Sequence, residues 1–291
     1  MKLSALLLFI CLPFGALCQD AAANHYKIYN TATQKQVTLN SIVDDMGKAD
    51  VLFWGEEHND STGHTLEYAL FKALSQKYPQ LTALSMEMFT TDCQLVLNEY
   101  LAGFTREKNL VSDARTWPNY KDYRPMVEWA KTSGLPVIAA NAPSRYTNMV
   151  TRGGLGSLQQ LSALAKSYLA PLPIDTATGA YYDKFVKIMG GHEAMAGMQI
   201  YQSQNLWDAT MGWSIAQFYN NHAGYKILQL NGGFHSEEKL GAVAQLKKYA
   251  PKARVLTVEA YADDSFDNPD WSKFKALADY IILTDPKLRK E

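Results

Sequence analysis

The segment VLFWGEEHND, residues 51–60, joins a run of apolar residues to a glycine and a group of ionisable side chains. A short, continuously apolar run is typical of a strand that is buried on both faces of a parallel sheet. The glycine permits a tight turn out of that strand. Ligands of open α/β sheets bind just outside the carboxyl ends of the strands. This stretch therefore predicts both the fold class and the position of a site.

Further apolar runs of strand length alternate with helical patterns along the rest of the chain. The runs cover residues 81–89, 135–143, 225–235, 253–261 and 278–285. This alternation predicts an α/β fold, a parallel sheet with helices on both faces. The mostly helical stretch at about 156–222 is longer than an ordinary crossover, so we expect an inserted helical cap. It would serve either as a lid over one end of the sheet or as a thicker helical layer.

The N-terminus predicts export. Residues 1–18 have one lysine, an apolar stretch and then small residues, which is typical of a signal peptide. We expect a periplasmic or secreted protein; the alternative is a lipoprotein tethered to the membrane through Cys18. Residues 19–45 are expected to form an exposed lead-in with a short strand or hairpin, and residues 46–291 the α/β domain.

Composition and missing motifs exclude several classes of function. The formal net charge is −1, with acids and bases interspersed, which argues against a nucleic-acid partner. The sequence has no His-Glu-x-x-His, no Gly-x-Ser-x-Gly and no phosphate-binding glycine loop. It also lacks Cys-x-x-Cys-His, so covalent attachment of haem is excluded. The C-terminal DPKLRKE, residues 285–291, is expected to be a solvated tail.

Polar residues end four of the predicted strands, and we expect neighbouring strands to bring them into one cleft. Two ends share the pattern Gly-x-x-His, at His58 and His235, and a third carries Glu87. These three side chains suit a divalent transition metal such as Zn²⁺, or general acid–base chemistry. The fourth end carries Asn141 and Arg145. Each residue taken alone has a purely structural alternative, for Glu87 an ion pair with Arg145.

The predicted cap adds further candidates. A long helix is expected after Gly190-Gly191, and Tyr201, Gln204, Asp208 and Met211 fall on one of its faces. An aspartate is unusual on a plain core face, so we expect Gln204 and Asp208 to point into the cleft. An exposed face is the alternative. His192, at the start of this segment, is expected to reach the ligand from above.

Five ordered segments resemble the ChaN-type haem-binding proteins of the Tiki superfamily. They are GEEHND, MEMF, YRPMVEWAKTSGLPVIAANAPSR, SQNLWDATM and LNGGFH, and the resemblance extends over residues 50–259. It implies a parallel α/β core with helical additions, in exported bacterial proteins that take part in iron or haem acquisition. It also implies a homodimer that holds haem between its subunits, with a tyrosine as iron ligand and an assisting histidine.

Carried over to this chain, the resemblance implies Tyr123 as the tyrosine ligand, with Tyr120 close by, and His192 as the assisting histidine. A phenolate is a reasonable ligand of ferric haem. The alternative for Tyr123 is a packed aromatic ring with a hydrogen-bonded hydroxyl. The other residues assigned to the cofactor are Asn141, Arg145, Gln204 and Asp208.

Related branches of the superfamily resemble metal-dependent peptidases that use paired Gly-x-x-His motifs and a glutamate. The corresponding residues here are His58, Glu87 and His235, with Glu57 or Glu56 as general base. We therefore predict an exported haem-binding protein of iron or haem uptake. The alternatives are a metal-dependent hydrolase acting on a peptide or ester, and a relative without catalytic activity.

Overall fold

The computed structural model describes residues 24–191 and 199–289 of the chain. Its centre is an eight-stranded sheet with the strand order β2-β1-β8-β7-β3-β6-β4-β5. The six strands from β8 to β5 are parallel to one another, which confirms the predicted α/β class. The strands are β1 (Tyr26–Asn30), β2 (Lys35–Val37), β3 (Val51–Glu56), β4 (Thr82–Thr90), β5 (Val137–Asn141), β6 (Lys226–Gly232), β7 (Val255–Ala262) and β8 (Tyr280–Thr284).

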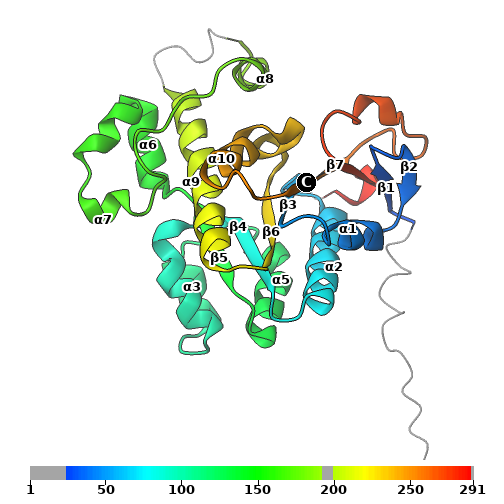
Figure 1. The fold of residues 1–291 in the computed structure, drawn as a ribbon, viewed down its shortest axis with the longest axis horizontal. Coiled ribbons are helices and arrows are strands. Elements are labelled where there is room, and N and C mark those ends of the chain that lie inside the picture. The colour runs from blue at the N-terminus through cyan, green and yellow to red at the C-terminus, as the bar shows by residue number, and fades with distance from the viewer. Residues whose placement is uncertain (1–23, 192–198, 290–291) are drawn as a thin grey trace, which may run out of the picture.

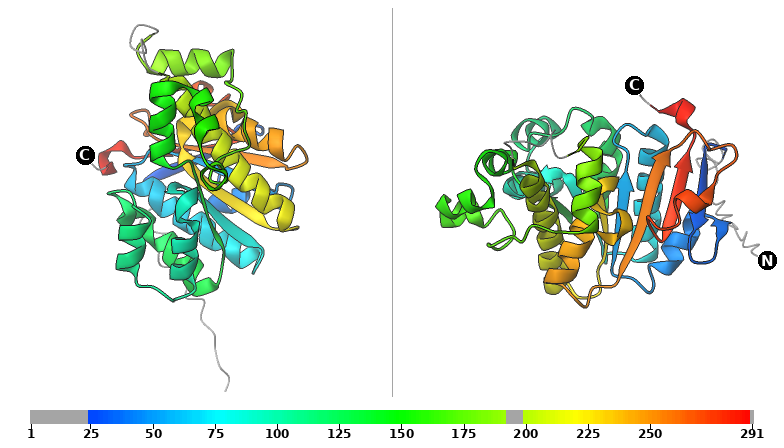
Figure 2. Two further views of the ribbon diagram at one scale, coloured as in Figure 1. Left: turned by 90° about the vertical axis from the view of Figure 1, so that its left-hand side faces the viewer. Right: turned by 90° about the horizontal axis from the view of Figure 1, so that it is seen from above.

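The sheet is mixed because an N-terminal hairpin extends it. Strand β1 pairs antiparallel with both β2 and β8. Figure 2 shows this hairpin in blue beside the C-terminal strand in red. Residues 19–45 were expected to be an exposed lead-in, but Ile28 is buried and Leu39, Ile42 and Val43 of the following helix enter the core. The apolar side chains of this segment therefore make its described part an integral edge of the sheet.

Helices cover both faces of the sheet (Figures 1 and 2). Side chains of β3 alternate between them: Leu52 and Trp54 join one core cluster, and Val51 and Phe53 the other. The first face is covered by α1 (Leu39–Asp45), α2 (Ser61–Lys77), α3 (Gln94–Leu101), α4 (Glu107–Asp113) and α5 (Tyr120–Ser133). The second is covered by α9 (Ile200–Asn221) and α10 (Gly241–Tyr249).

The region expected to be a cap divides into two parts. Helix α9 packs along α10 and β5, so most of it is an ordinary layer of the sheet. Helices α6 (Ser144–Gly153) and α7 (Ala163–Lys166) extend outward from α9 (Figure 1), and α8 (Ala180–Ile188) packs on its first turn. The long helix expected after Gly190-Gly191 begins, as described, at Ile200. The start of that expected helix, with His192, lies outside the described residues.

A side-chain hydrogen bond explains where α2 begins, and a glycine explains where α5 ends. Helix α2 is capped by the Asp60 side chain, which accepts a hydrogen bond from the Thr62 amide. Helix α5 ends at Gly134, which adopts the left-handed conformation that glycine tolerates best. Among the described residues, no helix is long and apolar enough to cross a membrane. The predicted signal peptide and Cys18 lie outside the described part of the chain.

Candidate functional site

The three neighbouring strands β3, β6 and β4 deliver His58, His235 and Glu87 to one place. Glu87 accepts a hydrogen bond from the Gly232 amide at 2.8 Å, and its other oxygen lies 3.5 Å from Nε2 of His235. A Cβ on Gly232 would lie 3.0 Å from Nε2 of His58 and 3.9 Å from Glu87 Oε2. The glycine therefore keeps open the space between this imidazole and this carboxylate.

A cleft of about 570 Å³ opens over these strand ends. Its volume lies within the roughly 300–1,000 Å³ that small-molecule and cofactor sites occupy. His58 is the more accessible of the two imidazoles, with 45% of its side chain exposed against 10% for His235. The cleft is lined by Glu56, Glu57, His58, Asn59, Asn119, Gly232, Gly233, Phe234, His235 and Arg289.

Each imidazole is held by a buried carboxylate on its Nδ1 side. His58 Nδ1 lies 2.7 Å from Glu56 Oε1, and His235 Nδ1 lies 2.7 Å from Asp208 Oδ1. Nε2 of His235 then faces Glu87, and Nε2 of His58 lies beside Gly232. A carboxylate or carbonyl partner on one ring nitrogen is the usual arrangement behind a metal-ligating histidine, because it fixes the ring and raises its basicity.

The charges of this group are mutually stabilising. Burial lowers the pKa of His235, but the charges of Glu87 and Asp208 outweigh it and raise that pKa to about 10. Burial lowers the pKa of His58 too, yet the hydrogen bond to Glu56 leaves it above its usual value. Burial raises the pKa of Glu87, but His235 and His58 bring it below its usual value. An incoming cation would therefore compete with protons on the imidazoles.

A second, fully buried cluster lies behind His58, and the sequence analysis did not identify it. His64 Nδ1 lies 3.1 Å from Glu67 Oε2 and 3.2 Å from Glu56 Oε2, while His64 Nε2 lies 3.1 Å from the His58 carbonyl. These spacings suit an imidazolium shared by two carboxylates, and the three donor atoms would also fit around a metal ion. The available signal was the i, i+3 pair of His64 and Glu67 on the buried face of α2.

Tyr123 belongs to this buried cluster. Its side chain is completely buried, and its hydroxyl donates to Glu56 Oε1 at 2.6 Å. Burial raises the pKa of Tyr123, and so does the neighbouring charge of Glu56, so a phenolate is strongly disfavoured. Tyr120 is also buried and packs edge-on against Phe89, and burial raises its pKa as well. Neither geometry offers a phenol oxygen to a ligand, and the alternative of a packed, hydrogen-bonded aromatic ring describes Tyr123.

The polar end of β5 stays apart from the cleft, because β5 is the outermost strand beyond β4. Neither Asn141 nor Arg145 lines the cleft. Asn141 Oδ1 accepts from the adjacent Ala142 amide, and Arg145 pairs with Asp92. The alternative of an ion pair between Glu87 and Arg145 is therefore also wrong. Strand β4 separates β5 from β6 and β3, whose ends line the cleft.

The polar residues predicted on α9, Gln204 and Asp208, do not line the cleft but contact His235, which does. Asp208 bonds His235, and the Gln204 amide nitrogen lies 3.1 Å from both His235 Nδ1 and the Tyr181 hydroxyl. Tyr181, on α8, donates to the second oxygen of Asp208 at 2.5 Å. Gln204 and Asp208 thus position His235, whereas Tyr201 packs against α8 and Met211 lies in the core.

The two glutamates after β3 differ in availability. Glu56 is buried: Oε1 meets Tyr123 and His58, and Oε2 forms an ion pair with His64 at 3.2 Å. Its pKa is well below the usual value, because these hydrogen bonds outweigh the effect of burial. Glu57 is partly exposed, and one of its oxygens accepts from the Ala262 amide at 2.8 Å. Of the two proposed general bases, the geometry favours Glu57.

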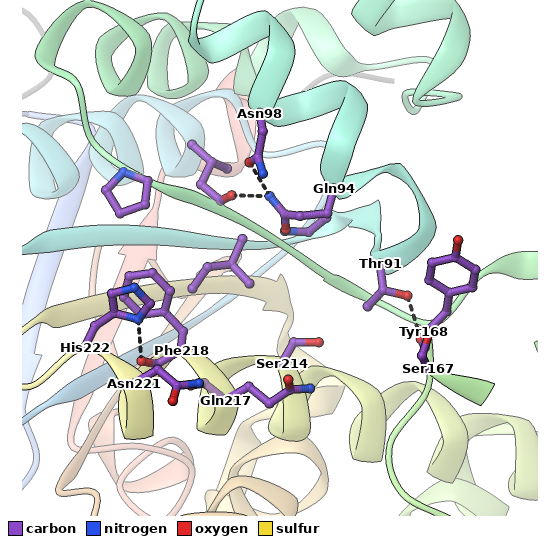
Figure 3. Close-up of a pocket in the computed structure, with 14 residues that line it drawn as sticks. Thr91, Gln94, Asn98, Ser167, Tyr168, Ser214, Gln217, Phe218, Asn221 and His222 are labelled. Atoms are coloured by element: carbon purple, nitrogen blue, oxygen red, sulfur yellow. Dashed lines mark hydrogen bonds between the residues drawn. The ribbon is translucent and has the colours of Figure 1, made fainter. Parts of the chain in front are cut away.

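A second hollow, of about 490 Å³, lies along the free edge of β5 between α3 and α9 (Figure 3). The Gln94 amide covers that edge: it donates to the Val137 carbonyl at 2.9 Å and accepts from the Ala139 amide at 2.7 Å. His222 lines the hollow, with Nδ1 directed at the Phe218 carbonyl. In the part of the chain that the structure describes, no carboxylate, lysine or arginine lines it. This hollow lacks the convergent ionisable groups of the cleft.

The fold and the cleft define a class: an α/β protein whose ligand site lies outside the carboxyl ends of its central parallel strands, with two carboxylate-bonded histidines. The family model described as haem-binding uptake, Tiki superfamily, ChaN matches residues 42–246, well over half of the chain. The chain therefore belongs to this haem-binding uptake family, as its sequence motifs predicted.

The match to one solved structure, with a TM-score above 0.5, supports the same fold. ChaN of Campylobacter jejuni, described with cofacial haem binding, is similar over 90% of this chain and 97% of its own, with 18% identity and a TM-score of 0.67. A mutant of the erythromycin esterase EreC in its open conformation is similar over 81% of this chain and 76% of its own, with 9% identity and a TM-score of 0.46. No match was found among the curated proteins.

Proposed function

We propose that this protein is an exported haem-binding protein of haem or iron uptake and that haem binds at the cleft over β3 and β6. Family membership supports haem as the ligand. The location rests on the half-exposed imidazole of His58, which lines the cleft with Nδ1 held by Glu56 and Nε2 beside Gly232.

The described residues of the cleft fit such a ligand. His58 offers a nitrogen atom as an iron ligand. The edge contact between its ring and that of Trp117, with centroids 5.1 Å apart, helps to fix the orientation of the imidazole. Phe234 gives the cleft wall an aromatic surface, and Arg289 gives it a fixed positive charge. Haem would supply an iron atom that accepts an axial nitrogen or oxygen ligand. Tyr123 and Tyr120 do not fit that role, and His192 lies outside the described residues.

Titration of the purified protein with hemin tests this proposal. The wild type is expected to shift the Soret band saturably. His58→Ala is expected to weaken binding by roughly tenfold or more and to change the band position, because loss of one outer partner of such a ligand already costs about tenfold to a hundredfold. Tyr123→Phe, which removes only a buried hydroxyl, is expected to keep the wild-type band.

The two variants distinguish His58 from Tyr123 as the iron ligand. A His58→Ala protein with the wild-type band and affinity would contradict the location, and loss of the band in Tyr123→Phe would restore the tyrosine prediction. His222→Ala, which changes an exposed histidine at the end of α9, serves as the control. A wild type without a saturable change in the Soret region would remove haem binding itself.

A second candidate function is metal-dependent hydrolysis of a peptide or ester. It is favoured by two carboxylate-bonded imidazoles near Glu87: His235 lies 3.5 Å from it, and His58 lies beside the same Gly232 whose amide Glu87 accepts from. A bound Zn²⁺ would polarise a carbonyl or activate water. His58, His235 and Glu87 are the residues that would hold it, and Glu57 stands at the cleft as a proton acceptor.

Gly232→Ala tests this candidate without deleting any ligand. The new methyl group would lie 3.0 Å from His58 Nε2 and 3.9 Å from Glu87 Oε2, in the space that an ion would share. We expect Gly232→Ala to bind Zn²⁺ about tenfold more weakly than the wild type, the lower end of the loss seen when an outer-shell partner of a metal ligand is changed. Competition with a chromogenic chelator measures the two affinities. Gly156→Ala is the control, since a Cβ there meets nothing within 4 Å. Equal Zn²⁺ affinity in both variants and the wild type would contradict the site.

A further inference from the structure

The last strand of the sheet brings a fifth polar end to the rim of the cleft. Strand β8 runs parallel to β7, which is parallel to β3, so its carboxyl end reaches the same side of the sheet as His58. A short 3₁₀ turn, Pro286–Leu288, follows, and the Asp285 side chain caps it by accepting from the Lys287 amide at 3.1 Å. Arg289 follows this turn directly and lines the cleft.

Arg289 is held on one side by the loop after β3. Its Nε donates to Asn59 Oδ1 at 2.9 Å, and its Nη2 lies 3.5 Å from Glu57 Oε1 as an ion pair. The Arg289 side chain is 42% exposed. A guanidinium has five N–H donors in a planar fork, so these two contacts leave several donors for a ligand. The loop thus orients the side chain without saturating it.

The charge of the cleft gives this residue a specific role. The lining includes the carboxylates of Glu56 and Glu57, and Glu87 lies next to His235. Among the described residues that line the cleft, Arg289 is the only lysine or arginine. The imidazoles of His58 and His235 are already paired with buried carboxylates, so a ligand's carboxylate finds an uncommitted positive charge at this one guanidinium. Arginine binds carboxylates through two parallel hydrogen bonds, which fixes orientation as well as charge.

We infer that Arg289 recognises a carboxylate of the ligand that binds in the cleft, so that the C-terminal segment sets the orientation and selectivity of the site. The inference rests on the proposed haem function, where the carboxylate is one of the two propionates of haem. The loose ion pair with Glu57 is then the contact that the ligand's carboxylate exchanges for a closer, bidentate one. Arg289, in the segment predicted from sequence to be a solvated tail, then belongs to the binding site.

Titrations with hemin and with hemin dimethyl ester, whose propionates carry no charge, test this role. Arg289→Ala is expected to bind hemin about tenfold more weakly than the wild type, the effect of one charge-assisted contact. Both proteins are expected to bind the ester with equal affinity. Arg289→Lys should recover only part of the hemin affinity, since lysine lacks the planar fork. Lys287→Ala is the matched control, because Lys287 is 77% exposed and pairs only loosely, at 3.9 Å, with Asp267.

The outcomes distinguish recognition from support of the fold. Equal hemin affinity of Arg289→Ala and the wild type would overturn the inference, while the saturable Soret shift of the wild type would still support haem binding. An equal loss for hemin and its ester would also overturn it, because Arg289 would then act through the loop and not through the propionate. A wild type that binds neither compound would overturn the inference together with the proposed function.

Discussion

Replacing Gly55 by alanine is expected to lower the free energy of unfolding by about 3 kcal/mol, the upper part of the range for overpacking a core. Gly55 lies in the central strand β3 directly opposite Glu259 of β7. A Cβ on Gly55 would lie 1.8 Å from Glu259 Oε2 and 2.4 Å from its carboxyl carbon. Because Glu259 is completely buried, it has no free space into which to move.

Removing the obstructing side chain should reverse most of this loss. Glu259 is a costly residue by itself: burial raises its pKa well above the usual value, and Oε2 has no hydrogen-bond partner. We expect the double variant Gly55→Ala, Glu259→Ala to be more stable than the sum of the single effects by about 2 kcal/mol, within the range of coupling energies for residues in contact. Urea denaturation of the four proteins of the cycle measures this coupling.

The matched control is Gly156→Ala, where a Cβ has open space and no effect beyond a few tenths of a kcal/mol is expected. In thermal unfolding, a loss of about 3 kcal/mol corresponds to roughly 6–12 °C for a chain of this size. Additive effects of Gly55→Ala and Glu259→Ala would show that the two side chains do not compete for one space, and would contradict the packing described for β3 and β7.

His64→Ala is expected to be comparably destabilising, by about 3–5 kcal/mol, the cost of removing one partner of a buried ion pair. The imidazole faces the buried carboxylates of Glu56 and Glu67, and its other nitrogen contacts the His58 carbonyl. Without it, Glu56 loses the ion pair at Oε2, although Oε1 keeps His58 and Tyr123. Denaturant unfolding of His64→Ala and of the exposed-histidine control His222→Ala measures the difference.

The pH dependence of this difference gives an independent check. Burial lowers the pKa of His64, but its hydrogen bonds and the charges of Glu56 and Glu67 outweigh this and raise it to about 11. A pKa raised above its unfolded value near 6.5 means that the contribution is complete below that pH and declines as the pH rises toward the folded value. The stability gap between wild type and His64→Ala should therefore narrow from pH 6 to pH 10. A constant gap, or one below 1 kcal/mol, would contradict a charged His64.

Several features of the site could be predicted from local sequence because they depend on local rules. Apolar runs that end in Gly-x-x-His identify strands and their carboxyl ends, which is why His58, Glu87 and His235 were expected together. The assignment of Tyr123 as an iron ligand came from the family resemblance and not from these rules, and no local pattern indicated Arg289. A tyrosine in a helical pattern gives no sign of whether its hydroxyl faces a ligand or a buried glutamate, and a charged C-terminal segment looks solvated wherever it lies.

The sequence by itself determined the α/β class, the family, and the residues that follow each strand, since strand and helix periodicity and strand-end glycines are properties of neighbouring residues. Only the tertiary structure decided the strand order β7-β3-β6-β4, which joins three strand ends and leaves that of β5 aside. It also decided that Glu56 bonds Tyr123 and that Arg289 returns to the cleft. These contacts join residues far apart in the chain, and their formation depends on packing the whole sheet, which no local pattern encodes.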